Sequence, residues 1–220
     1  MAAHGRRNTR LSGDDRQDAI LATAEKLLEE RALEEISVAD LAQGAGISRP
    51  SFYFYFSSKE NVLLVLLERV ISEVQHRVAA LPRNFEEEPA AAWRHSIGAF
   101  VDVFAAHRAV SAAAMTARLR NSDVHDLWSK SMQSWADYST EVILAERARG
   151  AAPEGVEAHD LAVALNLMNE RVLSAAFSAE APSVNQHNVL DVLAAIWISS
   201  IYGTGTIGPA AAGRAGSAAP

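Results

Sequence analysis

The sequence predicts an all-α protein of about nine helices, arranged as a small N-terminal domain and a larger helical domain. Two observations support this class. Every strong apolar periodicity has the spacing of a helix face, with apolar residues recurring three and four positions apart. Outside an aromatic run at 52–56, we find no alternation of apolar and polar residues typical of a strand. The 220 residues, 49% of them hydrophobic and 21% charged, are enough to bury a substantial core.

The first predicted helix covers residues 14–31, and apolar residues at helical spacing indicate its buried side: Ile20, Ala24, Leu27 and Leu28. Residues 1–13 precede it and contain Arg6, Arg7 and Arg10 with no acidic residue among them. We expect this segment to be a disordered basic arm, whose attraction to an anionic partner is screened by salt.

Two short helices are predicted inside the window 37–60, which has the sequence SVADLAQGAGISRPSFYFYFSSKE. Ser37 is placed to cap the first and Ser48 to cap the second, because a serine hydroxyl accepts a hydrogen bond from a free N–H of the first turn. Gly46 permits the tight reversal between the two helices. Pro50 falls in the first turn of the second helix, where a backbone N–H has no helical partner to lose.

A longer helix is predicted from residue 58 to about 81, because Ser57 and Glu60 match the capping-box pattern at its start. Apolar spacing and breaks at proline and glycine predict the remaining helices: one around Trp93–Phe104, and others at about 121–149, 157–180 and 184–203. Residues 204–220 are mostly glycine, alanine, proline and serine, and we expect a disordered tail there.

The two short helices and their turn match a helix-turn-helix, a motif that places its second helix in the major groove of DNA. The distribution of charge supports this interpretation. The chain has a net charge of −7, yet no acidic residue stands between Leu41 and Lys59. A phosphate backbone approaching this surface would therefore meet no repulsive side chain. We predict a DNA-binding domain over residues 14–60.

The aromatic run from Phe52 to Phe56 has two interpretations. Its composition is also that of a buried strand, because aromatic residues have high β propensity. A helix is favoured, since the run is short, follows Ser-Arg-Pro-Ser and precedes a capping pattern. On a helix, Phe52 and Phe56 share the core face and Tyr53 is turned away with its hydroxyl exposed. We therefore interpret the run as part of a recognition helix.

From Gly44 to Glu60 the sequence resembles the signature of the TetR family of DNA-binding transcriptional regulators, G-[AV]-G-[IV]-S-x-x-[ST]-[FL]-Y-x-Y-F-x-S-K-E. The resemblance implies that Arg49 reads a base, since an arginine can pair with guanine O6 and N7, and that its neighbours chiefly contact phosphates. Ala39 stands where some members carry a base-reading arginine, so shape and phosphate contacts are expected to provide more of the specificity. The candidate DNA-binding residues are Ser37, Ser48, Arg49, Pro50, Ser51, Tyr53, Tyr55 and Lys59.

All four tryptophans lie in the second predicted domain, residues 61–203, on apolar faces with helical spacing. Such faces form either an ordinary core or the wall of a pocket for an apolar ligand. Asn166 and Asn169 stand three positions apart in an apolar segment, and burying an unpaired amide is unfavourable. These asparagines therefore either bridge neighbouring helices or face a ligand.

The segments LNLMNER at 165–171 and WISSIYG at 197–203 resemble one branch of the same family. That resemblance implies a long hydrophobic channel in which the asparagine amides face the carbonyl group of a ligand. It also implies a homodimer in which the last two helices of each subunit form a four-helix interface. The candidate ligand-binding residues are Trp93, Ile97, Phe100, Phe104, Trp128, Met132, Trp135, Tyr138, Asn166, Asn169, Phe177 and Trp197.

Several classes of function find no support in the sequence. The chain has no cysteine, which excludes disulfides and thiolate chemistry. Its seven histidines show no metal-ligand spacing, and no nucleophile motif occurs, so we predict no catalytic residue, metal or cofactor. The G-x-G-x-x-G at 203–208 is discounted, because too few residues follow it to build a βαβ unit. No signal peptide or membrane span is visible, and we expect a cytoplasmic protein.

Together with these observations, the resemblance to the TetR family implies a homodimeric transcriptional repressor that binds palindromic double-stranded operator DNA and is released by an apolar small-molecule effector. A ligand can shift such an equilibrium only by binding one dimer geometry more tightly than the other. The alternatives are a ligand-independent regulator or an activator, and, with less support, a lipid-binding protein or an enzyme.

Overall fold

The computed structural model describes residues 13–82, 84–178 and 180–203. Over these residues the fold is all-helical, as predicted, with nine α-helices, two short 3₁₀ helices and no strand. The predicted basic arm, apart from Gly13, and the predicted tail at 204–220 lie outside the described residues. The helices are α1 (Gly13–Leu28), η1 (Leu33–Glu35), α2 (Val38–Gly44), α3 (Arg49–Tyr55), α4 (Lys59–Ala79), α5 (Pro89–Ala106), α6 (Arg108–Ala117), α7 (Ser122–Ala148), α8 (Ala158–Phe177), η2 (Gln186–Asn188) and α9 (Val189–Tyr202).

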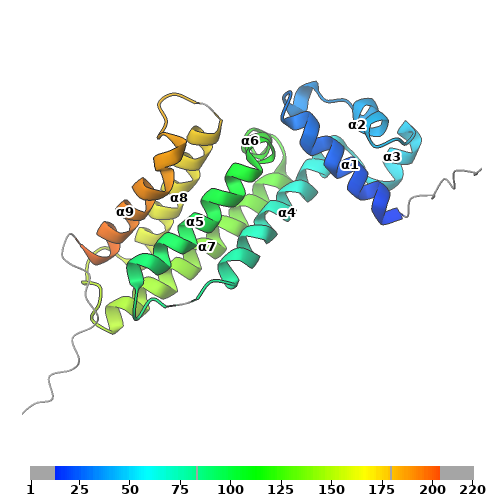
Figure 1. Ribbon diagram of the computed structural model, residues 1–220. Coiled ribbons are helices and arrows are strands. Elements are labelled where there is room, and N and C mark those ends of the chain that lie inside the picture. Colours follow the sequence, from blue (N-terminus) through cyan, green and yellow to red (C-terminus); the bar gives the residue numbers. More distant parts are fainter. Residues whose placement is uncertain (1–12, 83, 179, 204–220) are drawn as a thin grey trace, which may run out of the picture.

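Helices α1, α2 and α3 form a small N-terminal domain, called the head below (Figure 1). The apolar faces of these helices meet in a core where Ile20, Leu41 and Phe52 are almost fully buried. Phe52 and Phe56 both contribute to this core, and their ring centroids lie 6.0 Å apart. The run at 52–56 is therefore the end of a helix, and the strand interpretation is wrong.

Helix α4 connects the head to the second domain (Figure 1). One side of this 21-residue helix is buried along most of its length, from Val62 to Val74. It packs against α1 in the head and against α5, α6 and α7 in the second domain. Helix α4 therefore has packing contacts in both domains.

The cap at the start of α4 differs from the prediction by one residue. Ser58, and not Ser57, accepts a hydrogen bond, from the backbone N–H of Asn61 at 3.1 Å. The shift follows from Phe56, which ends α3 in an extended conformation with its ring in the core. The next helix begins only after the chain has turned away from that buried ring.

Helices α5 to α9 form the second domain, in which α7 packs against α8 and α5 against α9 (Figure 1). A break at His107 separates α5 from α6, and the two helices are bent by 87°. Apolar periodicity did not predict this break, because apolar and small residues continue on both sides of it. Among the described residues no single helix is long and apolar enough to cross a membrane, and α5 and α6 reach that length only as this bent pair.

Three other predicted boundaries differ modestly from the structure. The first helix ends at Leu28 and not at 31, and α8 ends at Phe177 and not at 180. The last helix begins at Val189 and not at 184, because η2 precedes it. Helix ends are set by local caps and contacts that apolar periodicity does not resolve.

Candidate functional site

A glycine turn and a serine cap position the recognition helix α3. Gly46 has a φ of +67°, a conformation that residues with a Cβ rarely adopt. The Ser48 hydroxyl accepts a hydrogen bond from the backbone N–H of Ser51 at 3.2 Å and lies 2.8 Å from the Ser51 hydroxyl. Pro50 falls in the first turn, as predicted. These local contacts decide where α3 begins and therefore which of its residues face outward.

Helix α2, which precedes the turn, begins with a reciprocal cap. The Ser37 hydroxyl accepts a hydrogen bond from the backbone N–H of Asp40 at 3.1 Å, and the Ser37 N–H donates to Asp40 Oδ2 at 2.9 Å. Hydrogen bonds from Ser37, followed by the charge of Arg31, hold the pKa of the Asp40 carboxyl below its usual value. The predicted DNA contact Ser37 therefore already uses its hydroxyl in the cap, where it also donates to Asp40 at 2.8 Å.

The outward face of α3 includes a residue that the sequence analysis missed. Among the predicted contacts, Arg49, Pro50 and Tyr53 are exposed, whereas Ser51 and Tyr55 are half-buried. Phe54 is 83% exposed. Helical geometry contained the signal, because Phe54 is rotated by about 200° from the buried Phe52. An exposed aromatic ring on a recognition helix offers an apolar contact to thymine methyl groups.

Lys59 is half-buried at the start of α4, and its role as a phosphate contact stays a prediction. Its ammonium group donates hydrogen bonds to the backbone carbonyls of Leu33, Glu34 and Ile36, at 2.7, 3.1 and 2.9 Å. An ammonium group has three N–H donors, so these contacts occupy all of them. Lys59 therefore ties the segment around η1 to the start of α4.

We expect Lys59→Ala to lower the free energy of unfolding by about 1–3 kcal/mol, because three carbonyl oxygens lose a charged donor. Chemical denaturation followed by circular dichroism measures this change. Lys26→Ala is the matched control, since Lys26 is exposed on α1 and its loss should change stability by less than about 0.5 kcal/mol. If Lys59→Ala left the stability unchanged and weakened DNA binding, Lys59 would act as a phosphate contact.

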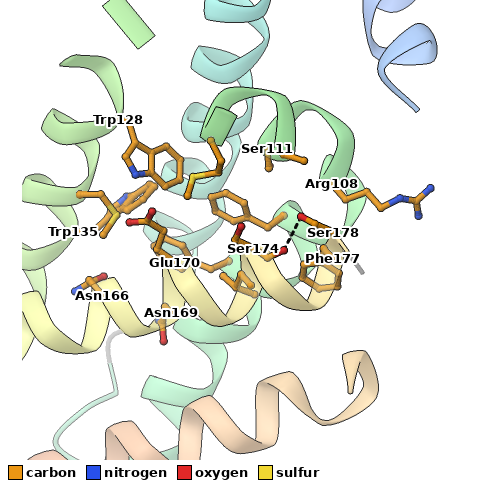
Figure 2. Close-up of a pocket in the computed structure, with 16 residues that line it drawn as sticks. Arg108, Ser111, Trp128, Trp135, Asn166, Asn169, Glu170, Ser174, Phe177 and Ser178 are labelled. Atoms are coloured by element: carbon orange, nitrogen blue, oxygen red, sulfur yellow. Dashed lines mark hydrogen bonds between the residues drawn. The ribbon is translucent and has the colours of Figure 1, made fainter. Parts of the chain in front are cut away.

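Two adjoining cavities lie in the second domain. The first, of about 40 Å³, lies between α5, α6, α7 and α8 and is called the α6 chamber (Figure 2). The second, of about 200 Å³, lies between α4, α5, α7, α8 and α9 and is called the α9 chamber. Both are lined by Phe100, Trp135, Asn166 and Asn169. The rings of Phe100 and Trp135 meet edge to face with centroids 5.0 Å apart, at the junction of the two chambers.

All the predicted ligand-binding residues line these chambers. Besides the four shared residues, the α6 chamber is lined by Phe104, Trp128, Met132 and Phe177. The α9 chamber is lined by Trp93, Ile97, Tyr138 and Trp197. The sequence analysis missed the contribution of α6, whose Ser111 and Met115 line the α6 chamber. The aromatic faces therefore border a cavity as well as contributing to the core.

The two asparagines have different roles in the structure. Asn166 donates from its amide nitrogen to the Ala162 carbonyl at 2.9 Å and to the Ser139 hydroxyl at 3.3 Å, so it bridges α8 and α7. Asn169 accepts a hydrogen bond from Trp197 Nε1 at 2.9 Å. Because an indole N–H only donates, the Asn169 oxygen must face Trp197, and its amide N–H groups are directed elsewhere. Of the two amides, Asn169 is the better placed to donate to a ligand.

Three buried polar atoms of the α6 chamber have no hydrogen-bond partner within the described part of the chain: Ser111 Oγ, Trp128 Nε1 and Trp135 Nε1. Buried donors are normally paired, so this set calls for an explanation. A ligand with acceptor oxygens would supply one. The same described residues contain no cluster of three or more side chains suited to hold a metal ion.

A buried polar cluster connects the C-terminal ends of α7 and α9, and the sequence analysis missed it. Glu146 is 2% exposed and accepts hydrogen bonds from the Arg149 guanidinium at 2.7 and 2.6 Å and from the Tyr202 hydroxyl at 2.7 Å. Trp93 Nε1 donates to the same hydroxyl at 3.1 Å. Burial and the neighbouring Glu146 carboxylate raise the pKa of Tyr202, which keeps the phenol neutral. The cluster fixes Trp93, a wall of the α9 chamber.

Two sequence families match this chain. The family described as bacterial regulatory proteins, tetR family, matches residues 20–66, which contain α2, α3 and the start of α4. The family described as transcriptional regulator EthR, C-terminal domain, matches residues 93–203, which run from α5 to α9. The two matches therefore cover the candidate DNA interface and most of the residues that line both chambers.

Full-length relatives agree with these matches. The chain is 54% identical over 200 residues to the HTH-type transcriptional regulator EthR of Mycobacterium tuberculosis, covering 90% of this chain and 93% of that protein. It is 47% identical over 206 residues to the HTH-type transcriptional regulator EthR of Mycolicibacterium smegmatis, covering 94% and 95% of the two chains. Both relatives are named as transcriptional regulators and not as enzymes.

A solved structure shares the fold at low sequence identity. A TetR-family transcriptional regulator from Syntrophomonas wolfei superposes with a TM-score of 0.70 at 14% identity, covering 90% of this chain and 100% of that one. At this identity the likeness concerns the fold alone. The motif at 37–60, the matched families and the identity to full-length regulators give one conclusion: the chain belongs to the TetR family of bacterial transcriptional regulators, with the C-terminal domain of EthR-type members.

Proposed function

We propose that this regulator is a repressor, which binds palindromic operator DNA as a homodimer and leaves it when an apolar ligand fills the two chambers. The observation that supports release most directly is the position of α6. Ser111 and Met115 on this helix line the α6 chamber, while Arg108 at its start pairs at 2.6 Å with Glu29, directly after α1. A ligand that displaces α6 therefore acts on the head through a direct contact.

Exposed apolar residues on the last two long helices support the homodimer. Leu167 on α8 is 52% exposed and Ile196 on α9 is 38% exposed. Pairing of α8 and α9 with their counterparts in a second subunit would bury this surface. A two-fold dimer presents two recognition helices, which fit successive major grooves when they lie about 34–36 Å apart.

We expect Arg49→Ala to weaken binding to a specific operator by about 1–3 kcal/mol and to relax the preference at one base pair per half-site. The reason is that Arg49 is exposed in the first turn of α3, where its forked donors can reach a base edge. Fluorescence anisotropy with promoter fragments retained from the protein's own genome measures the change. Arg94→Ala, an exposed change on α5, is the control. If Arg49→Ala lowered the affinity for operator and random duplexes equally, Arg49 would not be the residue that reads a base.

The chambers indicate the chemistry of the ligand. Their walls are mostly aromatic and aliphatic, which suits a long apolar molecule. The donors available to it are the Asn169 amide and the unpaired Ser111, Trp128 and Trp135 groups. The acidic side chain of the α6 chamber, Glu170, is already paired with Arg118 at 2.7 Å. The proposed ligand is therefore uncharged and carries one or more acceptor oxygens, as in an ester, ketone or amide.

A screen of long-chain esters, ketones and amides should yield compounds that raise the melting temperature and release DNA. Asn169→Ala should weaken binding of such a compound by about 0.5–1.5 kcal/mol, because one hydrogen bond to its carbonyl is lost. A hydrocarbon of equal length is the matched control, and its affinity should not change. In cells, a reporter gene behind the operator separates a released repressor from an activator. If no apolar compound both stabilises the protein and releases DNA, the chambers are packing defects of the core.

A further inference from the structure

His107 occupies the break between α5 and α6 and touches both the head and the connector helix. Its Nδ1 lies 3.0 Å from Glu25 Oε1 on α1, and its Nε2 lies 3.1 Å from Glu73 Oε2 on α4. The His107 backbone itself belongs to the second domain. The charged residue of α5 nearest to it in sequence, Asp102, is exposed. One half-buried side chain thus joins three elements where the head is attached.

Only the imidazolium form of His107 satisfies both contacts. An ionised carboxylate accepts hydrogen bonds and cannot donate them. A neutral imidazole has one N–H and one lone pair, so one of the two contacts would set that lone pair against a carboxylate oxygen. The imidazolium donates from both nitrogens, and both hydrogen bonds are then assisted by charge.

The carboxylates and arginines near this site form further ion pairs. Glu73 also pairs with Arg77 at 2.6 Å, and Arg108, beside the histidine, pairs at 2.6 Å with Glu29, directly after α1. Burial tends to raise the pKa of Glu73, but hydrogen bonds from Arg77 and His107 outweigh it and leave that pKa below its usual value. Glu73 therefore stays ionised through the pH range in which histidine gains its proton. Both nearby arginines have carboxylate partners of their own.

We propose that the imidazolium of His107 is a positioning residue that holds α1 of the head on the second domain, so that the head loosens when the ring loses its proton. Histidine ordinarily changes charge between about pH 5 and 8. The tie needs the protonated ring and is lost when that proton leaves. The ion pairs Arg108–Glu29 and Arg69–Asp18 remain, so the head stays attached. The proposal needs the DNA-binding head but neither the ligand nor the dimer interface.

Loosening of the head has a consequence for DNA binding. A recognition helix must be presented at a fixed orientation to enter the major groove. If only a fraction of the molecules holds that orientation, the apparent affinity falls in proportion to the fraction. Operator affinity is therefore expected to decrease when the His107 ring loses its proton.

The head's position can be measured with spin labels, because the chain has no cysteine of its own. Exposed positions Ala22 on α1 and Glu141 on α7 accept cysteines for labelling. Labelled protein mixed with an excess of unlabelled protein reports one distance within one subunit, whatever the oligomeric state. We expect a narrow distance distribution at about pH 5.5 and a broader one at about pH 8.

Three variants identify the group responsible. His107→Gln, which cannot carry charge, should give the broad distribution at both pH values. His107→Arg, which donates to both carboxylates at any pH, should give the narrow one at both. The control is His76→Gln, since His76 is exposed on α4 with the Ser72 hydroxyl near its ring, and it should behave as the wild type. An unchanged wild-type distribution, or a pH response that persists in His107→Gln, overturns the proposal.

Two further measurements do not depend on how well the variants fold. The ring signal of His107 in a proton–carbon correlation spectrum of the wild type should titrate with the same midpoint as the distance distribution. Binding to promoter fragments retained from genomic DNA should weaken over the same interval at constant ionic strength. Different midpoints, or DNA binding that ignores the change in distance, would show that His107 is only a packing residue.

Discussion

Replacing Glu146 by alanine should lower the free energy of unfolding by about 3–5 kcal/mol, because removing one partner of a buried ion pair leaves the other uncompensated. Glu146 is 2% exposed, and its two oxygens hold Arg149 and Tyr202. Without it, the Arg149 guanidinium keeps only its bond to the Phe85 carbonyl, at 2.8 Å, among the hydrogen bonds of the described residues. The Tyr202 hydroxyl loses its acceptor as well.

Urea denaturation measures this loss, with Glu141→Ala as the matched control. Glu141 stands on the same helix but is exposed, so its removal should change stability by less than about 0.5 kcal/mol. Glu146→Gln separates charge from shape, because an amide still accepts from Tyr202 but cannot neutralise Arg149. A loss of stability in Glu146→Ala as small as in the control would contradict this prediction. It would mean that water hydrates the Arg149 side chain, which is 20% exposed.

Trp197→Ala is expected to lower the free energy of unfolding by about 3–5 kcal/mol, the usual range for truncating a buried tryptophan. The indole is 2% exposed, its ring centroid lies 4.9 Å from that of Trp93, and its N–H is bonded to Asn169. The change removes a wall between the core and the α9 chamber and frees the Asn169 amide to rotate. Ligand affinity should therefore fall together with stability.

Trp197→Phe keeps an aromatic ring but removes the N–H and part of the buried indole, so a cycle of variants is needed to separate the hydrogen bond from the packing. Combined with Asn169→Ala in a double-mutant cycle, it should show a coupling of about 0.5–1.5 kcal/mol. Thermal and urea unfolding provide the stabilities of the four proteins. A coupling of zero would mean that other neighbours set the orientation of the Asn169 amide. Its N–H groups would then have no fixed direction toward the ligand.

Much of the head could be predicted from sequence, because its elements are defined by local chemistry. Ser37, Ser48, Gly46 and Pro50 act within a few residues of themselves, and each was found where its type is normally used. The role of Lys59 could not be predicted in this way. Its partners lie 23 to 26 residues earlier in the chain, and no local pattern indicates which carbonyls it meets.

The second domain shows the same division between local and distant information. Helical spacing placed the aromatic residues on common faces, and the faces do converge on the chambers. The cluster at Glu146 could not be predicted from the sequence, because Tyr202 lies 56 residues from Glu146 and 109 from Trp93. The break at His107 could not be predicted for a similar reason. The residues that hold the His107 ring lie far away on α1 and α4, while the local sequence favours an uninterrupted helix.

The hydrogen bonds from Lys59 to the carbonyls at 33–36 limit where a junction can be placed when the DNA-reading segment is exchanged between regulators. A chimera with a single junction between 36 and 59 would take the carbonyls at 33–36 from one parent and the residue at position 59 from the other. Chimeras with junctions before 33 and after 59 keep donor and acceptors from the same parent. Chimeras with a single junction between 36 and 59 should be less stable, whatever operator they are meant to recognise.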